Sequence, residues 1–325
     1  MSVFNRLFVP PVALRPLILR AIRPFRLLIL HRLPLAMQIR RQWRQRFGTP
    51  LDLRNPRTFN QKIQWLKVHS NTPLHTRCGD KIAVRDYVAE VVGPDILIPL
   101  IMTTGDPDDI RPERICAERF VVKTNHDSGS VVICRDRRDF DWAECREKLR
   151  KHMQRNFYEY TLEPSYKNIV PRILVEEFKE DDGEDLADLK ILCFHGSPEI
   201  ITLNITEDGQ KWNLTYDKRL ERVNVRRVYP TYPRARRPPG DIQAMLAAAA
   251  KLAAPFPLCR VDLYPAEGRI WFGELTFFPN SGLVSFDPPE IDLAWGDLID
   301  LKRARRQLDR LRRDGKDRRK RRERS

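Results

Sequence analysis

Residues 260–276 read RVDLYPAEGRIWFGELT, two strand-like runs joined by a short turn. A three-residue loop, Glu267-Gly268-Arg269, closes such a β-hairpin when Gly268 takes the left-handed conformation. The predicted cross-strand pairs are Ala266 with Ile270, Tyr264 with Phe272, Asp262 with Glu274, and Arg260 with Thr276. Because residues two positions apart share one face of a strand, the last two pairs place four polar side chains on the same face.

Asp262 and Glu274 are the most informative of these pairs. Carboxylates in directly paired positions have Cβ atoms about 4.5–5.5 Å apart, and like charges there are destabilising. A divalent cation removes the repulsion, and oxygen ligands suit Mg²⁺ that is bound together with substrate phosphates. We therefore predict a Mg²⁺ site with Asp262, Glu274 and Thr276 as ligands. An ordinary ion-pair network, in which Arg260 and a lysine neutralise both acids, would explain the same pattern.

A second candidate lies in FVVKTNHDSGS at 120–130, where Lys123 ends an apolar strand and a loop of small and polar residues follows. Such a lysine can reach nucleotide phosphates, and loop N–H groups around Ser128 and Gly129 can cover them. The motif is not the GxxxxGK[ST] loop, because the lysine comes first and no helix follows immediately. A surface hairpin would have the same sequence, and in it His126 is best interpreted as a hydrogen-bonding loop residue.

Two further segments place charges beside buried runs. In the run ILVEEF at 173–178, Glu176 and Glu177 follow a buried apolar stretch. A strand beside an adenine base would use such an acid to bind the nucleotide. Alternatively, the strand simply reaches solvent at these two residues. Asp188 and Lys190 share one strand face, and a lysine buried there requires an anion, which a phosphate would supply.

The remaining patterns predict a mixture of helices and strands. Apolar residues recur at helical spacing in 59–70, 80–92, 142–155 and 241–254. Other strands are predicted at 96–101, 120–122, 131–134, 189–194, 200–206 and 212–216, with an acidic loop at 180–188. We expect the tail beyond Leu301 to be a charged helix or a disordered arm.

Charge is concentrated at the two ends of the chain. The formal net charge is +15 over 325 residues, but residues 1–50 carry +10 and residues 302–325 carry another +10, which leaves about −5 for the body. Six cysteines are scattered singly, which disfavours a zinc site or a secreted disulfide scaffold and fits a reducing compartment. No apolar run approaches the roughly 18 residues of a spanning helix. These features predict a cytoplasmic protein.

The basic ends have several interpretations. The Leu-, Ile- and Arg-rich segment 1–50 could lie on an anionic membrane surface, pack as a layer on the body, or be a transit peptide, the last being least favoured. The tail 302–325 would attract any polyanion, but it lacks the interleaved aromatic residues of a nucleic-acid stacking platform. We therefore expect peripheral contact with the inner face of a membrane rather than specific nucleic-acid binding.

The order of these parts is similar to that of ATP-grasp enzymes, and more narrowly it resembles the TupA-like ATP-grasp family, which is linked to teichuronopeptide and other surface-polysaccharide synthesis. The resemblance covers roughly residues 50–301. Its matching stretches are NPRTFNQKIQWLK (55–67), DKIAVRDYV (80–88), FVVKTNHDSGS (120–130), PRILVEEF (171–178), DLKILCFHG (188–196) and VDLYPAEGRIWFGELTFFPNSG (261–282).

The resemblance implies an α+β ATP-grasp fold that binds ATP and Mg²⁺ between two α+β subdomains. The body would span 51–301, with a smaller lid-like subdomain at 110–172 and a C-terminal subdomain at 173–301. By position, Lys123 and Lys81 would contact the nucleotide, Glu176 and Glu177 would lie at the adenine hinge, Lys190 and Arg260 would neutralise phosphate or acyl-phosphate, and Asp262 and Glu274 would bind Mg²⁺. Many ATP-grasp ligases have Glu-x-Asn where this chain has Glu274-Leu275-Thr276, so Asn280 is an alternative ligand.

The resemblance further implies an ATP-dependent carboxylate–amine ligase that works through an acyl-phosphate. Its substrates would be amino acids or uronate-bearing glycans of a surface polymer. A glycosyltransferase would usually need a DxD metal motif, and DDGED at 181–185 lies in a predicted loop. An ATP-grasp sugar kinase and a non-catalytic protein that binds polyanions or membranes are further alternatives.

Overall fold

The structure, a computed structural model, describes residues 33–180 and 188–322. The chain divides into two compact units, Met1–Pro50 and Leu51–Ser325. In the first unit, helix α2 (Leu35–Phe47) ends at Gly48, whose φ of 73° is the left-handed conformation common at helix ends. Most of the segment for which we predict membrane contact lies outside the described residues. No helix within the described ranges is long and apolar enough to span a bilayer.

The second unit contains a six-stranded antiparallel sheet with the strand order β10-β9-β5-β6-β7-β8. Its strands are β5 (Asp188–Phe194), β6 (Ser197–Glu207), β7 (Gln210–Asp217), β8 (Arg222–Val223), β9 (Leu258–Ala266) and β10 (Arg269–Thr276). Ile191, Cys193 and Val261 are fully buried in the core that also contains helix α8 (Ile242–Ala253). Lys190 and Arg260 alternate with these residues and therefore lie on the opposite, polar face.

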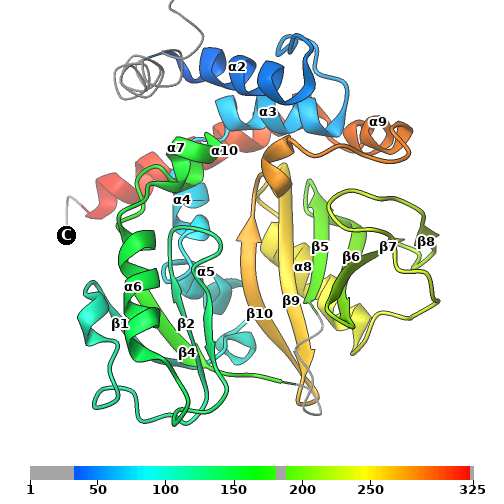
Figure 1. The fold of residues 1–325 in the computed structure, drawn as a ribbon. Coiled ribbons are helices and arrows are strands. Elements are labelled where there is room, and N and C mark those ends of the chain that lie inside the picture. Colours follow the sequence, from blue (N-terminus) through cyan, green and yellow to red (C-terminus); the bar gives the residue numbers. More distant parts are fainter. Residues whose placement is uncertain (1–32, 181–187, 323–325) are drawn as a thin grey trace, which may run out of the picture. The chain divides into compact units, whose positions relative to one another are not determined.

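A four-stranded antiparallel sheet has the order β1-β4-β2-β3. It consists of β1 (Leu100–Thr104), β2 (Phe120–Thr124), β3 (Val132–Cys134) and β4 (Ile173–Glu177). Phe120, Val122 and Val175 form a separate core with Leu149 of helix α6 (Trp142–Met153). Figure 1 shows the two sheets side by side, each with its own helix. The class is therefore α+β, as predicted.

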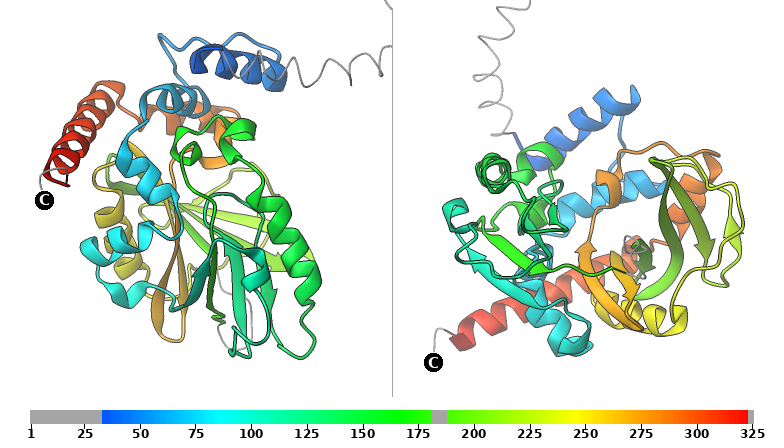
Figure 2. Two further views of the ribbon diagram at one scale, coloured as in Figure 1. Left: turned by 90° about the vertical axis from the view of Figure 1, so that its left-hand side faces the viewer. Right: turned by 60° about the horizontal axis from the view of Figure 1, so that its bottom comes forward.

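Side-chain caps fix the starts of two predicted helices. Helix α3 (Phe59–His69) begins at Thr58, whose side chain accepts from Gln61 N while the Gln61 side chain accepts from Thr58 N. Asp241 caps α8 by accepting from Ala244 N at 3.0 Å. The other helices are α4 (Pro73–Gly79), α5 (Val84–Val91), α7 (Phe157–Thr161), α9 (Glu290–Asp297) and α10 (Leu301–Arg322), with short 3₁₀ helices η2 (Pro94–Ile96), η3 (Pro107–Asp109), η4 (Pro164–Tyr166) and η5 (Pro279–Gly282). Figure 2 shows α10 as a long helix outside the sheets.

The predicted three-residue loop of the β9–β10 hairpin is wrong, although two of its predicted pairs are right. Glu267 and Gly268 both have positive φ and form a two-residue turn, so Tyr264 pairs with Trp271 instead of Phe272, and Ala266 with Arg269 instead of Ile270. A bulge at Gly273 then restores the register, so that Asp262 pairs with Glu274 and Arg260 with Thr276. A Cβ at Gly273 would lie 2.7 Å from the Tyr264 ring, which occupies the space that a side chain would need.

Two other predicted elements are corrected. Residues 96–101 do not form a buried strand: η2 ends at Ile96, and β1 begins only at Leu100, which is exposed. Pro94 and Pro99 explain this, because proline has no N–H for a sheet ladder. The helix predicted at 80–92 begins at Val84, because the Asp80 side chain accepts from Ile82 N at 2.8 Å and holds a turn there. The DDGED motif lies outside the described residues.

Candidate functional site

A row of paired residues crosses the polar face of the six-stranded sheet. Glu274 on β10 pairs with Asp262 on β9, Asp262 pairs with Lys190 on β5, and Lys190 pairs with Thr202 on β6. Arg260 precedes Asp262 by two residues and lies on the same face. Antiparallel pairing thus brings predicted residues from distant parts of the sequence into one line.

The Arg260 guanidinium lies between the two carboxylates. Its Nε is 2.6 Å from Asp262 Oδ1, and one terminal nitrogen is 2.7 Å from Asp262 Oδ2 and 2.8 Å from Glu274 Oε1. Lys190 Nζ is 2.9 Å from Asp262 Oδ2 and 2.6 Å from Asp188 Oδ2. We refer to Lys190, Arg260, Asp262 and Glu274 as the charge cluster.

Opposite charges keep this cluster ionised despite its burial. For Asp262, burial raises the pKa, but Arg260 and Lys190 outweigh it and hold the pKa below its ordinary value. For Arg260, burial lowers the pKa, and Asp262 and Glu274 raise it above its ordinary range. For Lys190, burial likewise opposes the charge, and Asp262 raises the pKa. Asp262, Arg260 and Lys190 therefore depend on their neighbours for their charges.

Ion pairs surround Asp262 and Glu274, the two carboxylates predicted to bind a metal. Arg260 and Lys190 already compensate the like charges, so repulsion alone does not require a divalent cation. Among the described residues, no three His, Cys, Asp or Glu side chains form a metal-binding group. Mg²⁺ bound with nucleotide phosphates needs only one or two carboxylates, however. Glu274 suits that role, because its side chain is 34% exposed whereas that of Asp262 is 2% exposed.

Thr276 and Asn280 have different positions around this carboxylate. Thr276 Oγ1 donates to Glu274 Oε1 at 3.1 Å, so the hydroxyl orients Glu274. Asn280 lies in η5 and has a φ of 50°. Its side chain lines a cavity that opens beside the charge cluster. The segment that contains Asn280 is anchored by α3: Lys67 Nζ donates to Ser281 Oγ at 2.7 Å, and Gln64 Nε2 donates to Gly282 O at 2.8 Å. Residues of the stretch 55–67 thus hold the backbone segment that carries Asn280.

On the four-stranded sheet, Lys123 and Glu176 form a second charged group. Lys123 Nζ is 2.5 Å from Glu176 Oε2, and Arg85 of α5 is 3.1 Å from Glu176 Oε1. Glu177 is separate, because its side chain alternates to the other face and pairs with Lys179 at 3.2 Å. The structure therefore brings Lys123 and Glu176 together and places Glu177 elsewhere.

The loop after β2 is held by its own side chains. Ser130 Oγ accepts from Thr124 N at 3.0 Å and is 2.8 Å from Thr124 Oγ1, while Asp127 binds the Thr124 hydroxyl. Within 124–130 only Ser128 and Gly129 are exposed, and Gly129 has a φ of 88°. The two residues predicted to cover phosphates thus form the tip of an anchored loop.

Lys81 links this loop to the charge cluster. Its backbone N–H donates to Asn125 O at 3.0 Å, and its Nζ donates to Asp127 O at 2.5 Å. The same Nζ is 3.9 Å from Glu274 Oε2. Burial lowers the pKa of Lys81, and Glu274 counteracts that shift. Lys81 is therefore a cation that connects the loop after β2 with Glu274 of β10.

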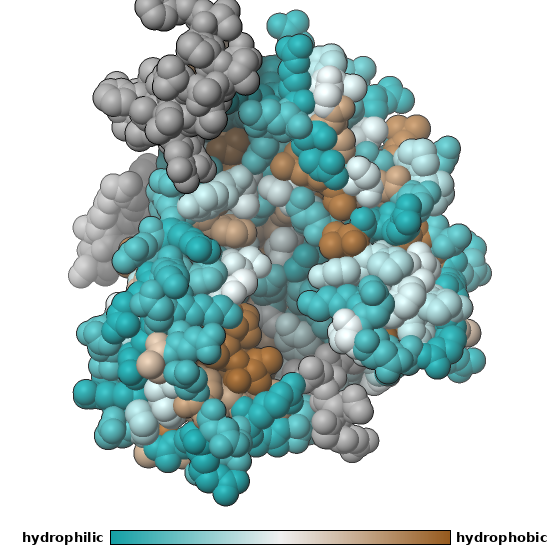
Figure 3. Space-filling model, in the orientation of Figure 1, coloured by the Kyte–Doolittle hydropathy of each residue, from teal (hydrophilic) through white to brown (hydrophobic). Residues whose placement is uncertain are grey.

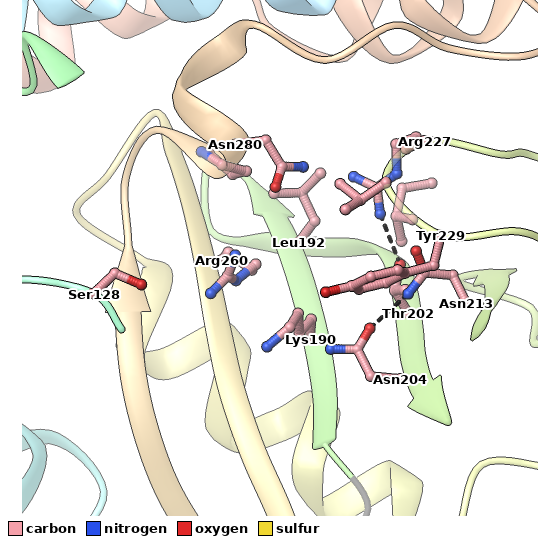
Figure 4. Close-up of a pocket in the computed structure, with 13 residues that line it drawn as sticks. Ser128, Lys190, Leu192, Thr202, Asn204, Asn213, Arg227, Tyr229, Arg260 and Asn280 are labelled. Atoms are coloured by element: carbon pink, nitrogen blue, oxygen red, sulfur yellow. Dashed lines mark hydrogen bonds between the residues drawn. The ribbon is translucent and has the colours of Figure 1, made fainter. Parts of the chain in front are cut away.

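A cavity of about 330 Å³ opens beside the charge cluster. In Figure 4, Ser128 lies at one end, Lys190 and Arg260 lie in the middle, and Arg227 and Tyr229 lie at the other end. Figure 3 shows that the face of the molecule seen in Figure 1 is hollowed between the two sheets. The cavity thus leads from the anchored loop across both cations to a third group of polar residues.

Several of these residues were missed by sequence reasoning. Arg85 lies in the matching stretch DKIAVRDYV, where its helical position beside Lys81 could have indicated it. Asn204 and Asn213 lie on strands whose alternation was recognised, but amides there gave no specific chemical signal. Arg227 and Tyr229 lie in an irregular, proline-containing segment, whose placement depends entirely on tertiary contacts.

Lys190, Arg260 and Arg227 thus line one cavity, which the loop after β2 reaches through Ser128, and the carboxylates Asp262 and Glu274 contact Arg260 beside it. A model of the TupA-like ATP-grasp family matches residues 61–300, which is most of the chain. The chain belongs to the TupA-like ATP-grasp family. The predicted fold and enzyme class are thereby confirmed.

Solved structures of ATP-grasp enzymes are also similar to this chain. The ATP-grasp ligase PsnB in complex with a minimal precursor is 10% identical at a TM-score of 0.38, and the match covers 64% of this chain but 55% of PsnB. D-alanine–D-alanine ligase from Bacillus anthracis in complex with ATP is 13% identical at a TM-score of 0.41, covering 78% of this chain and 74% of the ligase. D-cycloserine synthetase DcsG is 20% identical at a TM-score of 0.34, and the match covers 63% of this chain and 64% of DcsG.

No curated protein matches the sequence. The TM-scores of the solved structures are low, so the assignment of the fold rests on the family match and on the two antiparallel sheets.

Proposed function

We propose that this protein is a Mg-ATP-dependent carboxylate–amine ligase. The observation that carries the proposal is the charge cluster, which places Arg260 beside the partly exposed carboxylate of Glu274 and Lys190 beside Asp262, at a cavity that ends at Ser128. In such a site, catalysis consists mainly of positioning the phosphates and neutralising their charge.

The proposed reaction has two steps. A carboxylate oxygen of the substrate attacks the γ-phosphorus of ATP, the bond to the bridging oxygen breaks, and ADP leaves. The amine nitrogen then attacks the acyl carbon, the C–O bond to phosphate breaks with its electron pair going to phosphate, and the nitrogen loses a proton. The products are an amide, ADP and inorganic phosphate.

Most of the predicted residues have a role in this proposal. Lys190 and Arg260 hold the transferring phosphoryl group, while Lys123, Lys81 and the tip at Ser128 and Gly129 hold the rest of the triphosphate. Glu176 keeps Lys123 oriented and lies near the base. Mg²⁺, bound through Glu274 and Asp262 together with phosphate oxygens, would supply further charge neutralisation.

We place the reaction in the synthesis of a cell-surface polysaccharide or a teichuronopeptide-like polymer, with an amino acid and a uronate-bearing glycan as substrates. We further propose a cytoplasmic location at the inner face of the membrane, where residues 1–50 and 302–325 would contact anionic lipid. The basis is the family and the charge of +10 in each terminal segment.

The test is an assay of ADP and phosphate release with panels of carboxylates and amines. We expect release that requires both partners, and with an ¹⁸O-labelled carboxylate we expect one label in the phosphate released. A kinase would instead give a phosphorylated acceptor and no amide, and a glycosyltransferase would consume a nucleotide sugar. Either result would overturn the ligase assignment.

A further inference from the structure

One arm of the cavity contains an arginine that the charge cluster does not use. Arg227 donates from a terminal nitrogen to Thr202 Oγ1 at 3.1 Å, the one hydrogen bond that its side chain makes within the described part of the chain. Its Cζ lies over the rings of Trp295 and Phe286, at 4.8 and 6.0 Å from the ring centroids. A guanidinium has five N–H donors in a planar fork, so most of its donors are available to a ligand.

The charge of Arg227 is also unbalanced. No carboxylate among the described residues forms an ion pair with it, whereas the adjacent Arg226 pairs with Asp287 at 2.8 Å. Burial, and after it the neighbouring Arg260 guanidinium, lower the pKa of Arg227 to about 10. A partly buried cation beside a second cation is costly unless an anion compensates it. The arm therefore has the electrostatics of an anion site.

Backbone hydrogen bonds hold Arg227 in this position. Residues 225–232 are joined to β7 by bonds from Asn213 N to Pro230 O at 2.9 Å and from Tyr232 N to Asn213 O at 2.8 Å. They are joined to the segment before α9 by the bond from Arg226 N to Asp287 O at 2.8 Å. The backbone of the arm is therefore held by hydrogen bonds within the protein, and a site held in this way lowers the entropic cost of binding.

Amide and hydroxyl groups surround the rest of the arm. Asn213 Nδ2 donates to Asn204 Oδ1 at 2.6 Å, and Asn204 Nδ2 donates to Asp188 Oδ2 at 2.8 Å. In Figure 4 the Tyr229 ring lies between these amides and Arg227, with its hydroxyl directed toward Lys190. Groups of this kind donate and accept hydrogen bonds and suit a small polar organic molecule better than a bare phosphate chain.

We propose that Arg227 binds the carboxylate of the substrate that is to be phosphorylated, and that Asn204, Asn213 and Tyr229 contact the polar groups of the same molecule. The proposal rests on the ligase function, in which ATP phosphorylates a carboxylate. With the nucleotide at Ser128 and the carboxylate at Arg227, the transferring phosphoryl group would lie between them, at Arg260 and Lys190 (Figure 4). The substrate class is a small carboxylic acid that bears further polar groups, such as hydroxyls or an amino group.

Calorimetric titration of the full-length chain, saturated with Mg²⁺ and a non-hydrolysable ATP analogue, tests this assignment. The probes are D-glucuronate against D-glucose and L-alanine against L-alaninamide, so that each pair differs in the carboxylate. We expect at least one acid to bind about tenfold or more tightly than its partner without the carboxylate, since a bidentate charged hydrogen bond contributes that much.

Arg227→Gln should abolish this preference, Arg227→Lys should retain part of it, and the neighbouring control Arg226→Gln should leave it unchanged. The affinity for the Mg-nucleotide should stay within about twofold in all three variants, since none alters the nucleotide end of the cavity; this value also shows that each variant is folded. The assignment is overturned if the wild-type protein prefers neither acid, if the preference survives in Arg227→Gln, or if that variant loses nucleotide affinity to the same extent.

The two proposals fail separately. Suppose that ADP release requires both a carboxylate and an amine, while the KM for the carboxylate is the same in Arg227→Gln as in the wild-type protein. In that case the subsite is wrong and the ligase function stands. If acids bind through Arg227 but no acid–amine pair stimulates ADP release, the subsite stands and the ligase function is wrong.

Discussion

The two sheets hold their charges in different ways. On the six-stranded sheet, Lys190, Arg260, Asp262 and Glu274 contact one another along paired strands, and Asp262 is almost fully buried. On the four-stranded sheet, Lys123 and Glu176 form a single pair with Arg85 as a second partner. The loop beside that pair is held by the Ser130 and Thr124 hydroxyls, by Lys81, and by the contact of Asp127 with His152.

The charge cluster should contribute to both stability and activity, whereas Lys123 should contribute mainly to nucleotide binding. Removing the buried Asp262 leaves Arg260 with Glu274 alone and Lys190 with Asp188 alone, so two cations lose compensation at once, and stability and activity should fall together. Removing Lys123 leaves Glu176 paired with Arg85, so nucleotide binding should weaken without a comparable loss of stability. The first three predictions below test this distinction.

Asp262→Asn should have the largest effect. The substitution removes the charge that compensates both Arg260 and Lys190, and breaking a buried pair typically costs about 3–5 kcal/mol of the free energy of unfolding. Activity should fall by about 10² or more, because the phosphoryl-binding cations lose their orientation. Urea unfolding and the ADP-release assay measure the two effects. Undiminished activity in this variant would contradict the proposed function.

Lys123→Met should raise the KM for ATP by about tenfold or more, the value of a lost charge-assisted hydrogen bond. The free energy of unfolding should change by less than half as much as in Asp262→Asn, because Arg85 still neutralises Glu176. Lys148→Met is the matched control, since Lys148 Nζ only donates to Val131 O near the same hairpin. Equal KM values in the two variants would remove Lys123 from the nucleotide site.

Ser130→Ala should cost about 1–3 kcal/mol, because it leaves the buried Thr124 N–H without an acceptor. Ser128→Ala, at the exposed tip of the same loop, should have little effect on stability. Denaturant midpoints at constant m-value compare the two variants. If both substitutions are neutral, the loop is not anchored as described.

The effect of the buried His75 should be confined to acidic pH. Its ring lies 4.6 Å from that of Phe277, directly after β10. Burial, and after it Arg312, lower the pKa of His75 to about 3 from an ordinary value of 6.5. The depressed pKa means that its contribution to stability is complete above about pH 6.5 and is lost as the pH falls toward 3.

The slope from His75 should approach about 1.4 kcal/mol per pH unit below pH 6.5. His75→Gln should flatten the pH dependence of the unfolding free energy in that range. Parallel slopes for the variant and the wild-type protein between pH 6.5 and 5 would show that His75 does not titrate on unfolding.

The sequence allowed much of the fold to be predicted, because local signals agreed with it. Thr58 and Asp241 mark helix starts through side-chain caps, and alternation identifies the strands of both sheets. The β9–β10 hairpin is more instructive, since two errors cancelled: the turn is one residue shorter than predicted, and the bulge at Gly273 adds the residue back. The role of Gly273 depends on the Tyr264 ring, a contact that no local pattern reveals.

The candidate site could be predicted only where its residues lie on regular strands. Asp262, Glu274 and Lys190 come together through strand pairing, which follows from alternation and register. The position of Arg260 between the carboxylates depends on side-chain conformation, so the choice between a metal and an ion-pair network stayed open. Arg227 is positioned by β7 and the segment before α9, and these long-range contacts leave no periodic signal.

Thermal unfolding of the wild-type chain with Mg-ATP, and separately with Mg-UDP-glucose at the same concentration, tests the central claim most directly. A nucleotide site on the charge cluster predicts stabilisation by Mg-ATP, about 2.7 kcal/mol at a hundredfold excess over Kd, and none by Mg-UDP-glucose. In Glu274→Gln the stabilisation by Mg-ATP should be largely lost. Stronger stabilisation by Mg-UDP-glucose, or no response to Mg-ATP in the wild-type protein, would contradict the account.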